Sequence, residues 1–107
     1  MELANNRLGE TVGAWIGTNP DLAGLTSLEL SGNSLGDRGV STLAASRHLE
    51  RLETLNVGGN QLGGRAALAL ASSPHLMRLK KLVFTNHRSV PEGIDALRQR
   101  FGDGLTL

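Results

Sequence analysis

Three residues that can bind a metal ion recur at a constant spacing. Asp21, His48 and His75 fall at every 27th position of the sequence, so they would stack in one column if the chain repeats with that period. Carboxylate and imidazole groups are ligands of Zn²⁺. Each of the three, however, comes directly before a leucine, in a polar stretch typical of a protein surface. We therefore interpret them as solvated residues and predict no metal site and no cofactor.

The other residues with catalytic chemistry form no complete site. The chain has no cysteine, so it contains neither a thiolate nucleophile nor a thiolate metal site. Two glycine pairs, Gly58-Gly59 and Gly63-Gly64, match neither the P-loop nor the dinucleotide-binding pattern. They are typical of turns. We therefore predict that the chain is not an enzyme.

The same period also governs the apolar residues, and it indicates the elements that hold these side chains. Three columns of leucines are Leu22, Leu49 and Leu76; Leu25, Leu52 and Leu79; and Leu28, Leu55 and Leu82. Asn6, Asn33 and Asn60 form a polar column with the same spacing. Self-similarity at such a period is the mark of a protein in which each repeated unit packs on the next.

Within each unit the residues follow the pattern L-x-x-L-x-L-x-x-N-x-L, at Leu25–Leu35 and, with Val57 for one leucine, at Leu52–Leu62. The pattern resembles the leucine-rich repeat family, and the period resembles its ribonuclease-inhibitor-like class. The resemblance implies an α/β fold, a right-handed leucine-rich repeat solenoid with short parallel strands inside and helices outside. The closing segment ALRQRFGDGLTL (96–107) is similar to that of many bacterial members, which implies a bacterial origin.

The residues of one unit support this order of elements. Leu28 and Leu30 alternate with polar residues, as in a strand with one buried face. Residues 31–36 are rich in Gly, Ser and Asn and predict a turn. A helix follows, and another follows Gly64. Their expected buried residues are Val40, Leu43, Ala44, Ala67, Leu70 and Ala71.

The last unit departs from the pattern. Ser89, Pro91 and Glu92 have the spacing of a capping box with proline in the first turn, and they predict the start of a helix. Gly102 suits its end. Leu105 and Leu107 follow Leu82 and Phe84 at a spacing shorter than the full period, so a shortened last coil would add Leu105–Leu107 as a final strand.

Each asparagine of the column comes where the chain leaves a strand and its backbone loses the sheet hydrogen bonds. An asparagine side chain carries two donors and an acceptor, enough to bond its own coil and the next. A buried group left unpaired there would cost about 1–3 kcal/mol. We therefore predict that Asn6, Asn33 and Asn60 form a structural ladder.

These units predict a single leucine-rich repeat domain over residues 1–107. Residues 1–24 form a partial first repeat, 25–51 and 52–78 are full repeats, and 79–107 are a degenerate last repeat with a C-terminal cap.

The first repeat lacks the Leu-x-x-Leu segment found before later strands, so its strand edge and the flank of its core are expected to be exposed. Three explanations stay open. The chain is the C-terminal part of a longer protein, this end pairs with a second copy, or Trp15 folds over and closes it. Trp15 either shields the first helix from water or, together with Leu3, forms an edge contact with a neighbouring repeat or subunit.

The resemblance implies a non-catalytic protein-protein interaction scaffold that binds through its concave sheet face. The alternative is an assembly fragment that self-associates, as a homodimer, through its uncapped N-terminal edge. The expected contact residues of the concave face are Glu29, Ser31, Thr54, Asn56, Gly58, Lys81, Val83 and Thr85.

Composition argues against a nucleic-acid or a membrane partner. Residues 1–46 hold two basic and five acidic side chains, and residues 47–107 hold nine and five. The basic residues form no dense patch with interleaved aromatics, which a nucleic-acid surface would need. No apolar run approaches the roughly 18 residues that span a bilayer. We predict a cytoplasmic protein with neither a nucleic-acid nor a membrane partner.

Overall fold

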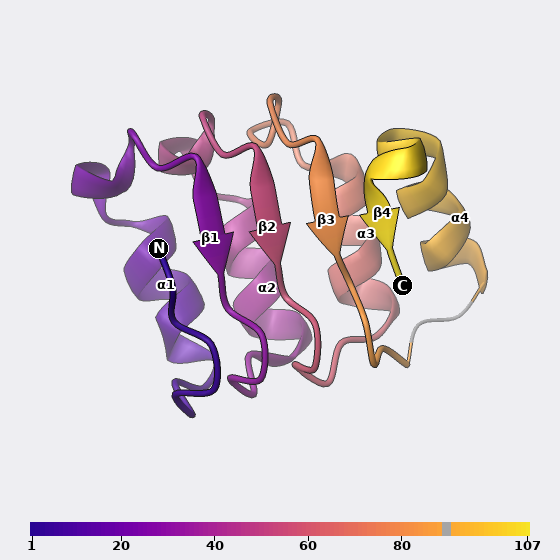
Figure 1. The fold of residues 1–107 in the computed structure, drawn as a ribbon, viewed down its shortest axis with the longest axis horizontal. Coiled ribbons are helices and arrows are strands. Elements are labelled where there is room, and N and C mark those ends of the chain that lie inside the picture. The colour runs from indigo at the N-terminus through magenta and orange to yellow at the C-terminus, as the bar shows by residue number, and fades with distance from the viewer. Residues whose placement is uncertain (89–90) are drawn as a thin grey trace.

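The computed structural model describes residues 1–88 and 91–107, in which strands and helices alternate along the chain (Figure 1). The strands are β1 (Ser27–Glu29), β2 (Thr54–Asn56), β3 (Lys81–Val83) and β4 (Leu105–Thr106). The helices are α1 (Thr11–Gly17), α2 (Gly36–Ala44), α3 (Gly64–Ser72) and α4 (Pro91–Phe101). Short 3₁₀ turns at Pro20–Leu22, Arg47–Leu49 and Gly102–Gly104 lead into β1, β2 and β4.

The four strands form one parallel sheet in the order β1-β2-β3-β4. Ser27 pairs with Thr54, and Thr54 pairs with Lys81, so the register advances by the sequence period at each coil. Leu82 pairs with Leu105, because the last coil is shorter. Each crossover from strand through helix to the next strand is right-handed, with the helices behind the sheet in Figure 1. The predicted right-handed α/β solenoid is confirmed.

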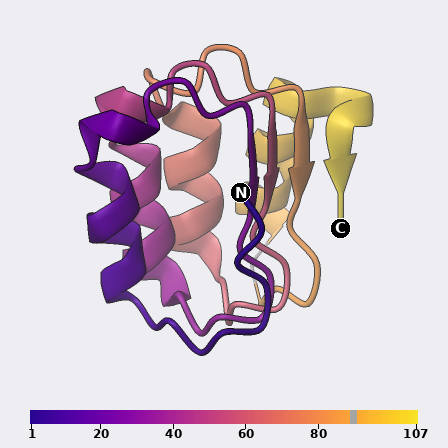
Figure 2. The same cartoon turned by 60° about the vertical axis from the view of Figure 1, so that its left-hand side comes forward.

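The core lies between the sheet and the helix layer (Figure 2). The strand leucines Leu28, Leu55 and Leu82 are buried on the helix side of the sheet. The expected helix residues are also buried, except that Ala66 takes the place of Ala71, which is only partly buried. Ala71 lies at the groove between α3 and α4, whereas Ala66 faces into the core. No helix of the described residues is long and apolar enough to cross a bilayer.

Glycines bring α1 and α2 into backbone contact. A Cβ atom on Gly13 would lie 2.2 Å from the carbonyl oxygen of Gly39, and one on Gly39 would lie 3.2 Å from the carbonyl oxygen of Glu10. The two helix backbones therefore meet without side chains between them. This close approach keeps the two helices in step with the adjacent strands that they connect.

Residues 1–5 extend the sheet beyond β1. The N–H of Leu3 donates to the Glu29 carbonyl at 2.8 Å, and the N–H of Glu29 donates to the Met1 carbonyl at 2.8 Å. Glu2 forms a single parallel bridge with Glu29. The far side of this segment is the open N-terminal edge of the sheet (Figure 1).

The C-terminal coil ends in a strand. Gly102 follows α4 with a φ of +52°, a left-handed conformation that glycine adopts without strain. Pro91 is the first residue of α4, and the predicted final strand is present as β4. The predicted capping box begins at Ser89, and Ser89 and Val90 lie outside the described residues.

Candidate protein-interaction surfaces

The open sheet face is the side of the sheet that turns away from the helices (Figure 2). It holds a shallow hollow of about 220 Å³ across β1, β2 and β3. Five of the eight predicted contact residues line this hollow, namely Glu29, Thr54, Asn56, Lys81 and Val83. Glu2 and Ser27 line it too. Ser27 was missed among the contact residues, although it stands one repeat before Thr54 and two before Lys81 in the sequence.

The remaining three predicted contact residues, Ser31, Gly58 and Thr85, do not line the hollow. Gly58 is buried, and a Cβ atom there would lie 2.2 Å from Thr85 Oγ1. The Thr85 hydroxyl thus occupies the space above Gly58, and the role of Gly58 as a contact residue stays a prediction. Ser31 and Thr85 are half-buried.

Two polar side chains of the open sheet face bond to the protein itself. Glu29 Oε2 accepts a hydrogen bond from Asn56 Nδ2 at 2.8 Å. Glu29 Oε1 accepts one from the Ser31 N–H at 2.8 Å, and Asn56 Oδ1 accepts one from the Gly58 N–H at 2.9 Å. Both side chains thus satisfy an N–H two residues later, where the backbone leaves the sheet. Their orientation is fixed before any partner arrives.

Glu2 is exposed at the N-terminal side of this face, and its carboxylate has no hydrogen bond or ion pair with another described residue. The same holds for the side chains of Lys81 and Ser27, which are also exposed. Thr54 lies between them in the register of the sheet. The face therefore offers a row of two hydroxyls and one ammonium group.

The N-terminal edge is a second surface, and it is more apolar. A hollow of about 300 Å³ is lined by Leu3, Leu8, Thr11, Val12 and Trp15. Trp15 is 56% exposed, so its indole borders this hollow without closing it. Leu3 and Leu8 are only partly buried. The apolar flank of the first coil remains accessible to a partner.

The asparagine column lies at the bends that follow the strands. Asn33 is buried, and its Nδ2 donates to the carbonyl of Leu30 in its own coil at 3.0 Å and to that of Leu3 in the preceding coil at 2.8 Å. Its Oδ1 accepts the N–H groups of Asn6 at 2.8 Å and Leu8 at 3.3 Å. One side chain therefore joins two coils through both of its polar atoms.

Asn60 repeats this arrangement one coil further along. Its Nδ2 donates to the carbonyls of Leu30 and Val57, both at 2.9 Å, and its Oδ1 accepts the N–H groups of Asn33 and Leu35. We expected each amide to bond its own coil and the next. It bonds its own coil and the preceding one, because the side chain reaches back to the carbonyl that the register places beside it.

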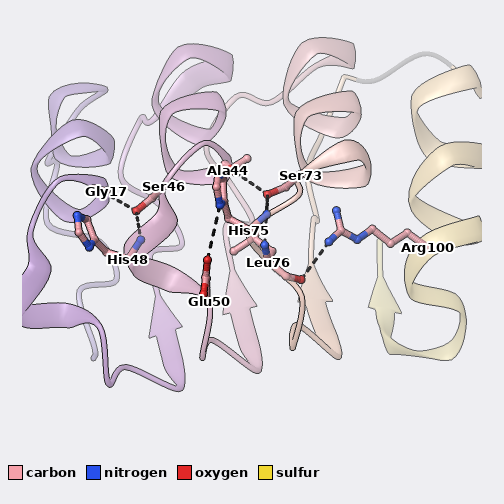
Figure 3. A network of polar contacts seen from close by, with 9 residues as sticks. All are labelled: Gly17, Ala44, Ser46, His48, Glu50, Ser73, His75, Leu76 and Arg100. Carbon is pink, nitrogen blue, oxygen red and sulfur yellow. Dashed lines mark hydrogen bonds and ion pairs between the residues drawn. The ribbon is translucent and has the colours of Figure 1, made fainter.

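A second polar column joins the coils where the helices end (Figure 3). Ser46 Oγ donates to the Gly17 carbonyl at 2.5 Å and accepts the His48 N–H at 3.1 Å. Ser73 Oγ donates to the Ala44 carbonyl at 2.5 Å and accepts the His75 N–H at 3.3 Å. Each serine thus satisfies a carbonyl at the end of the preceding helix and an N–H of its own turn.

Arg100 is the last member of this serine column, since Ser46, Ser73 and Arg100 occupy the same position in successive repeats. Its guanidinium donates to the carbonyl of Leu76 at 3.0 Å (Figure 3) and to that of Leu70 at 2.7 Å. Desolvation by burial lowers the pKa of Arg100, and the two carbonyl acceptors offset part of the cost of that burial. The sequence did not reveal the column, because it holds only two serines and ends in an arginine.

The Asp21, His48 and His75 column does not come together as a metal centre. Among the described residues, no three side chains of His, Cys, Asp or Glu are grouped so that they could hold a metal ion. His75 Nδ1 lies instead 3.8 Å from Glu50 Oε1, at the surface (Figure 3).

Residues 32–36, GNSLG, match the G-x-S-x-G pattern of a nucleophile elbow, a match that the prediction of no catalysis overlooked. Ser34 lies between β1 and α2 with a φ of +56°. Its side chain has no hydrogen bond to any described histidine or carboxylate. Arg7 and Gln61 occupy the same position in the neighbouring coils and have φ values of +52° and +60°. The left-handed residue therefore belongs to the bend of each of these coils.

Comparison with known proteins agrees with this geometry. The family model described as Leucine Rich repeat matches residues 25–44 and 45–71, which include β1, α2 and β2. No curated protein matches the chain. Repeats of this family generally mediate protein-protein interactions. Because the matched segments coincide with coils stacked in register in one parallel sheet, residues 25–71 are leucine-rich repeats.

Proposed function

We propose that the chain is a non-catalytic scaffold that binds a protein partner through the open sheet face. The observation that carries the proposal is the hollow of about 220 Å³ across three strands, on the side of the sheet that faces away from the helices. The constant register of the sheet and a helix in each coil also support the ribonuclease-inhibitor-like class.

The chemistry of the face suggests how a partner is held. Ser27, Thr54 and Lys81 stand side by side on adjacent strands, which are about 4.8 Å apart in a sheet. Val83, next to Lys81 on the same face of β3, adds a half-buried apolar contact. A partner segment that lies across the strands would place a carboxylate opposite Lys81 and hydrogen-bonding groups opposite the two hydroxyls.

The experiment compares capture of partners by the purified wild-type chain and by variants, with quantitative mass spectrometry of proteins from the source cell. Lys81→Glu and Val83→Glu should each reduce capture of the same protein about tenfold or more, because central contacts dominate interfaces. Lys80→Glu is the matched control, since Lys80 is also exposed and does not line the hollow. Equal capture by all four proteins would contradict binding at this face.

A second candidate function is self-association through the N-terminal edge. The specific observation in its favour is the apolar hollow of about 300 Å³ beside the open strand edge, with Trp15 exposed at its border. Apolar patches that adjoin an unpaired strand edge are the usual sites of chain-to-chain contact.

The two candidate functions respond to different substitutions. Leu3→Glu should lower the mass measured by light scattering if the edge self-associates, because it places a charge on the apolar flank. Asn56→Ala should leave that mass unchanged. The reverse result, loss of a captured partner with Asn56→Ala and no change in mass with Leu3→Glu, would leave only the open sheet face as a binding site.

A further inference from the structure

We propose that the N-terminal edge of one molecule stacks on the C-terminal edge of a second copy, so that copies associate head to tail. The inference rests on the second candidate function and names the surface that covers the N-terminal edge. The C-terminal edge consists of the outward side of β4, with Leu105 and Leu107, and of Arg98 on α4.

The main-chain groups of the two edges are complementary. Inside the molecule, Glu29 donates its N–H to the Met1 carbonyl and accepts the N–H of Leu3, both at 2.8 Å. Glu2 is the counterpart of Glu29 in the first coil, and its main-chain groups have no partner among the described residues. The Glu2 N–H and the Glu2 carbonyl can therefore bond to an acceptor and a donor that lie two residues apart on a parallel strand.

The C-terminal edge supplies this pair of groups. The Thr106 carbonyl accepts the Phe84 N–H at 2.8 Å, so Thr106 faces β3 and the alternation of a strand turns the Leu105 carbonyl and the Leu107 N–H outward. Leu105 pairs with Leu82 and so continues the column that begins at Met1. Leu105 and Leu107 of one copy can therefore bond to Glu2 of the other copy in the same way that Met1 and Leu3 bond to Glu29 within one molecule.

The asparagine column continues across the same contact. Asn33 Nδ2 reaches the Leu3 carbonyl of the preceding coil, in addition to bonds within its own coil. Among the described residues, Asn6 Nδ2 bonds only within its own coil, to the carbonyls of Leu3 at 2.9 Å and Ala4 at 3.2 Å. In the stacked pair, the main-chain oxygen of Leu107 lies beside Asn6 of the other copy, as the Leu3 carbonyl lies beside Asn33 within one molecule.

The helix layer brings an aromatic ring and a cation together. The groove between α3 and α4 is lined by Ala71 on one helix and Ala96 on the other, so these positions face each other on neighbouring helices. In the repeat, Trp15 of α1 takes the position of Ala96, and Arg98 of α4 takes the position of Ala71. Both are exposed. Stacking would set the Arg98 guanidinium against the indole of Trp15, a favourable cation–π contact.

Apolar contact and long-range charge favour the same orientation. Leu107 is 41% exposed and stands in the column of Leu3, so it packs on Leu3 in the stacked pair. Residues 1–46 hold an excess of three acidic side chains, and residues 47–107 hold an excess of four basic ones. Pairing two N-terminal edges would bring two acidic halves together, whereas head-to-tail stacking places the acidic half of one copy next to the basic half of the other.

The test measures molar mass against concentration by sedimentation and light scattering. Trp15→Arg blocks the N-terminal edge by facing Arg98 with a like charge. Leu107→Glu blocks the C-terminal edge by placing a carboxylate against the apolar side chain of Leu3. Leu68→Glu is the matched control, because Leu68 is 52% exposed on α3, between the two edges. Circular dichroism and thermal unfolding verify that each variant is folded.

We expect the wild type and Leu68→Glu to grow beyond a dimer with concentration, because a contact between two different edges does not close. Each edge variant alone should dissociate at least about tenfold more readily. An equimolar mixture of Trp15→Arg and Leu107→Glu should form a one-to-one dimer and nothing larger, because each variant keeps one intact edge.

Two results would overturn the inference. A wild-type dimer that Leu107→Glu leaves intact would show that two N-terminal edges pair, which removes head-to-tail stacking but keeps self-association. A wild type that stays monomeric at every concentration would remove both. Neither result bears on binding at the open sheet face, which is measured separately.

Discussion

At the scale of single residues, buried polar side chains replace the hydrogen bonds that the backbone loses where it turns. Asn33 and Asn60 do this at the bends after the strands, and Ser46 and Ser73 do it at the ends of the helices. Among the described residues no buried side-chain nitrogen or oxygen lacks a partner. Because a buried group left unpaired costs about 1–3 kcal/mol, these residues should be sensitive to substitution.

Replacing Asn33 with leucine should lower the free energy of unfolding by at least about 2 kcal/mol. Leucine is similar in size, but it leaves the carbonyls of Leu3 and Leu30 and the N–H of Asn6 without the bonds that Asn33 supplies. Ser34→Ala is the control, since Ser34 is exposed, and its effect should be under about 0.5 kcal/mol. Equal melting temperatures for the two variants would refute the asparagine ladder.

The serine column makes a parallel prediction for two adjacent serines. Ser73→Ala should cost about 1–2 kcal/mol, because it removes the bond to the buried Ala44 carbonyl and the acceptor for the His75 N–H. In the described part of the chain, the Ser72 hydroxyl bonds only to the Leu68 carbonyl of its own helix, and Ser72 is exposed. Ser72→Ala should therefore change stability by less than about 0.5 kcal/mol. Chemical denaturation of both variants measures the difference, and a larger loss for Ser72→Ala would contradict the role of Ser73.

At the scale of elements, short helices depend on their neighbours. α1 has seven residues and α3 has nine, lengths at which an isolated helix is not stable in water. Their stability comes from packing against the sheet and against each other. The close approach of α1 and α2 at Gly13 and Gly39 is the tightest example.

Gly13→Ala should therefore destabilise the protein by about 1–3 kcal/mol, the range for overpacking a tight contact. The new Cβ would lie 2.2 Å from the Gly39 carbonyl oxygen, and both backbones would have to move. A Cβ on Gly24 meets nothing within 4 Å, so Gly24→Ala serves as control with a change under about 0.5 kcal/mol. Trp15 fluorescence during unfolding reports whether α1 detaches first, and equal stabilities would show that α1 can shift without cost.

The sequence predicts the register of the sheet well, because identical leucines mark each column and Leu28, Leu55 and Leu82 do pair across it. It predicts the serine column poorly, because only Ser46 and Ser73 share a residue type, while Arg100 acts at the same place with a different side chain. The misplaced Ala71 has a similar cause, since a helix full of alanines gives a weak periodic signal.

The binding surfaces were predicted less completely than the fold, because side chains on a solvated face follow no apolar pattern. The sequence places Glu29 and Asn56 on one face, but it does not reveal that they bond to each other and to the backbone. Likewise, the burial of Gly58 depends on where the Thr85 hydroxyl points.

At the scale of the whole molecule, each coil contacts mainly its neighbours, so the structure is a stack with one open face and two ends. Stability in such a stack is close to a sum of coil and interface contributions. The open sheet face, the N-terminal edge and the C-terminal edge are therefore separate surfaces. A substitution at one of them should leave the other two intact.

The claim on which this account rests is that side-chain amides hold successive coils together in register. Native-state hydrogen exchange measured by NMR tests it most directly, because the N–H groups of Asn33 and Leu35 donate to Asn60 Oδ1 at 2.8 and 3.1 Å. We expect these two amides to exchange only through global unfolding, while the amide of the exposed Ser34 between them exchanges rapidly. Exchange of Asn33 and Leu35 as fast as that of Ser34 would contradict the account.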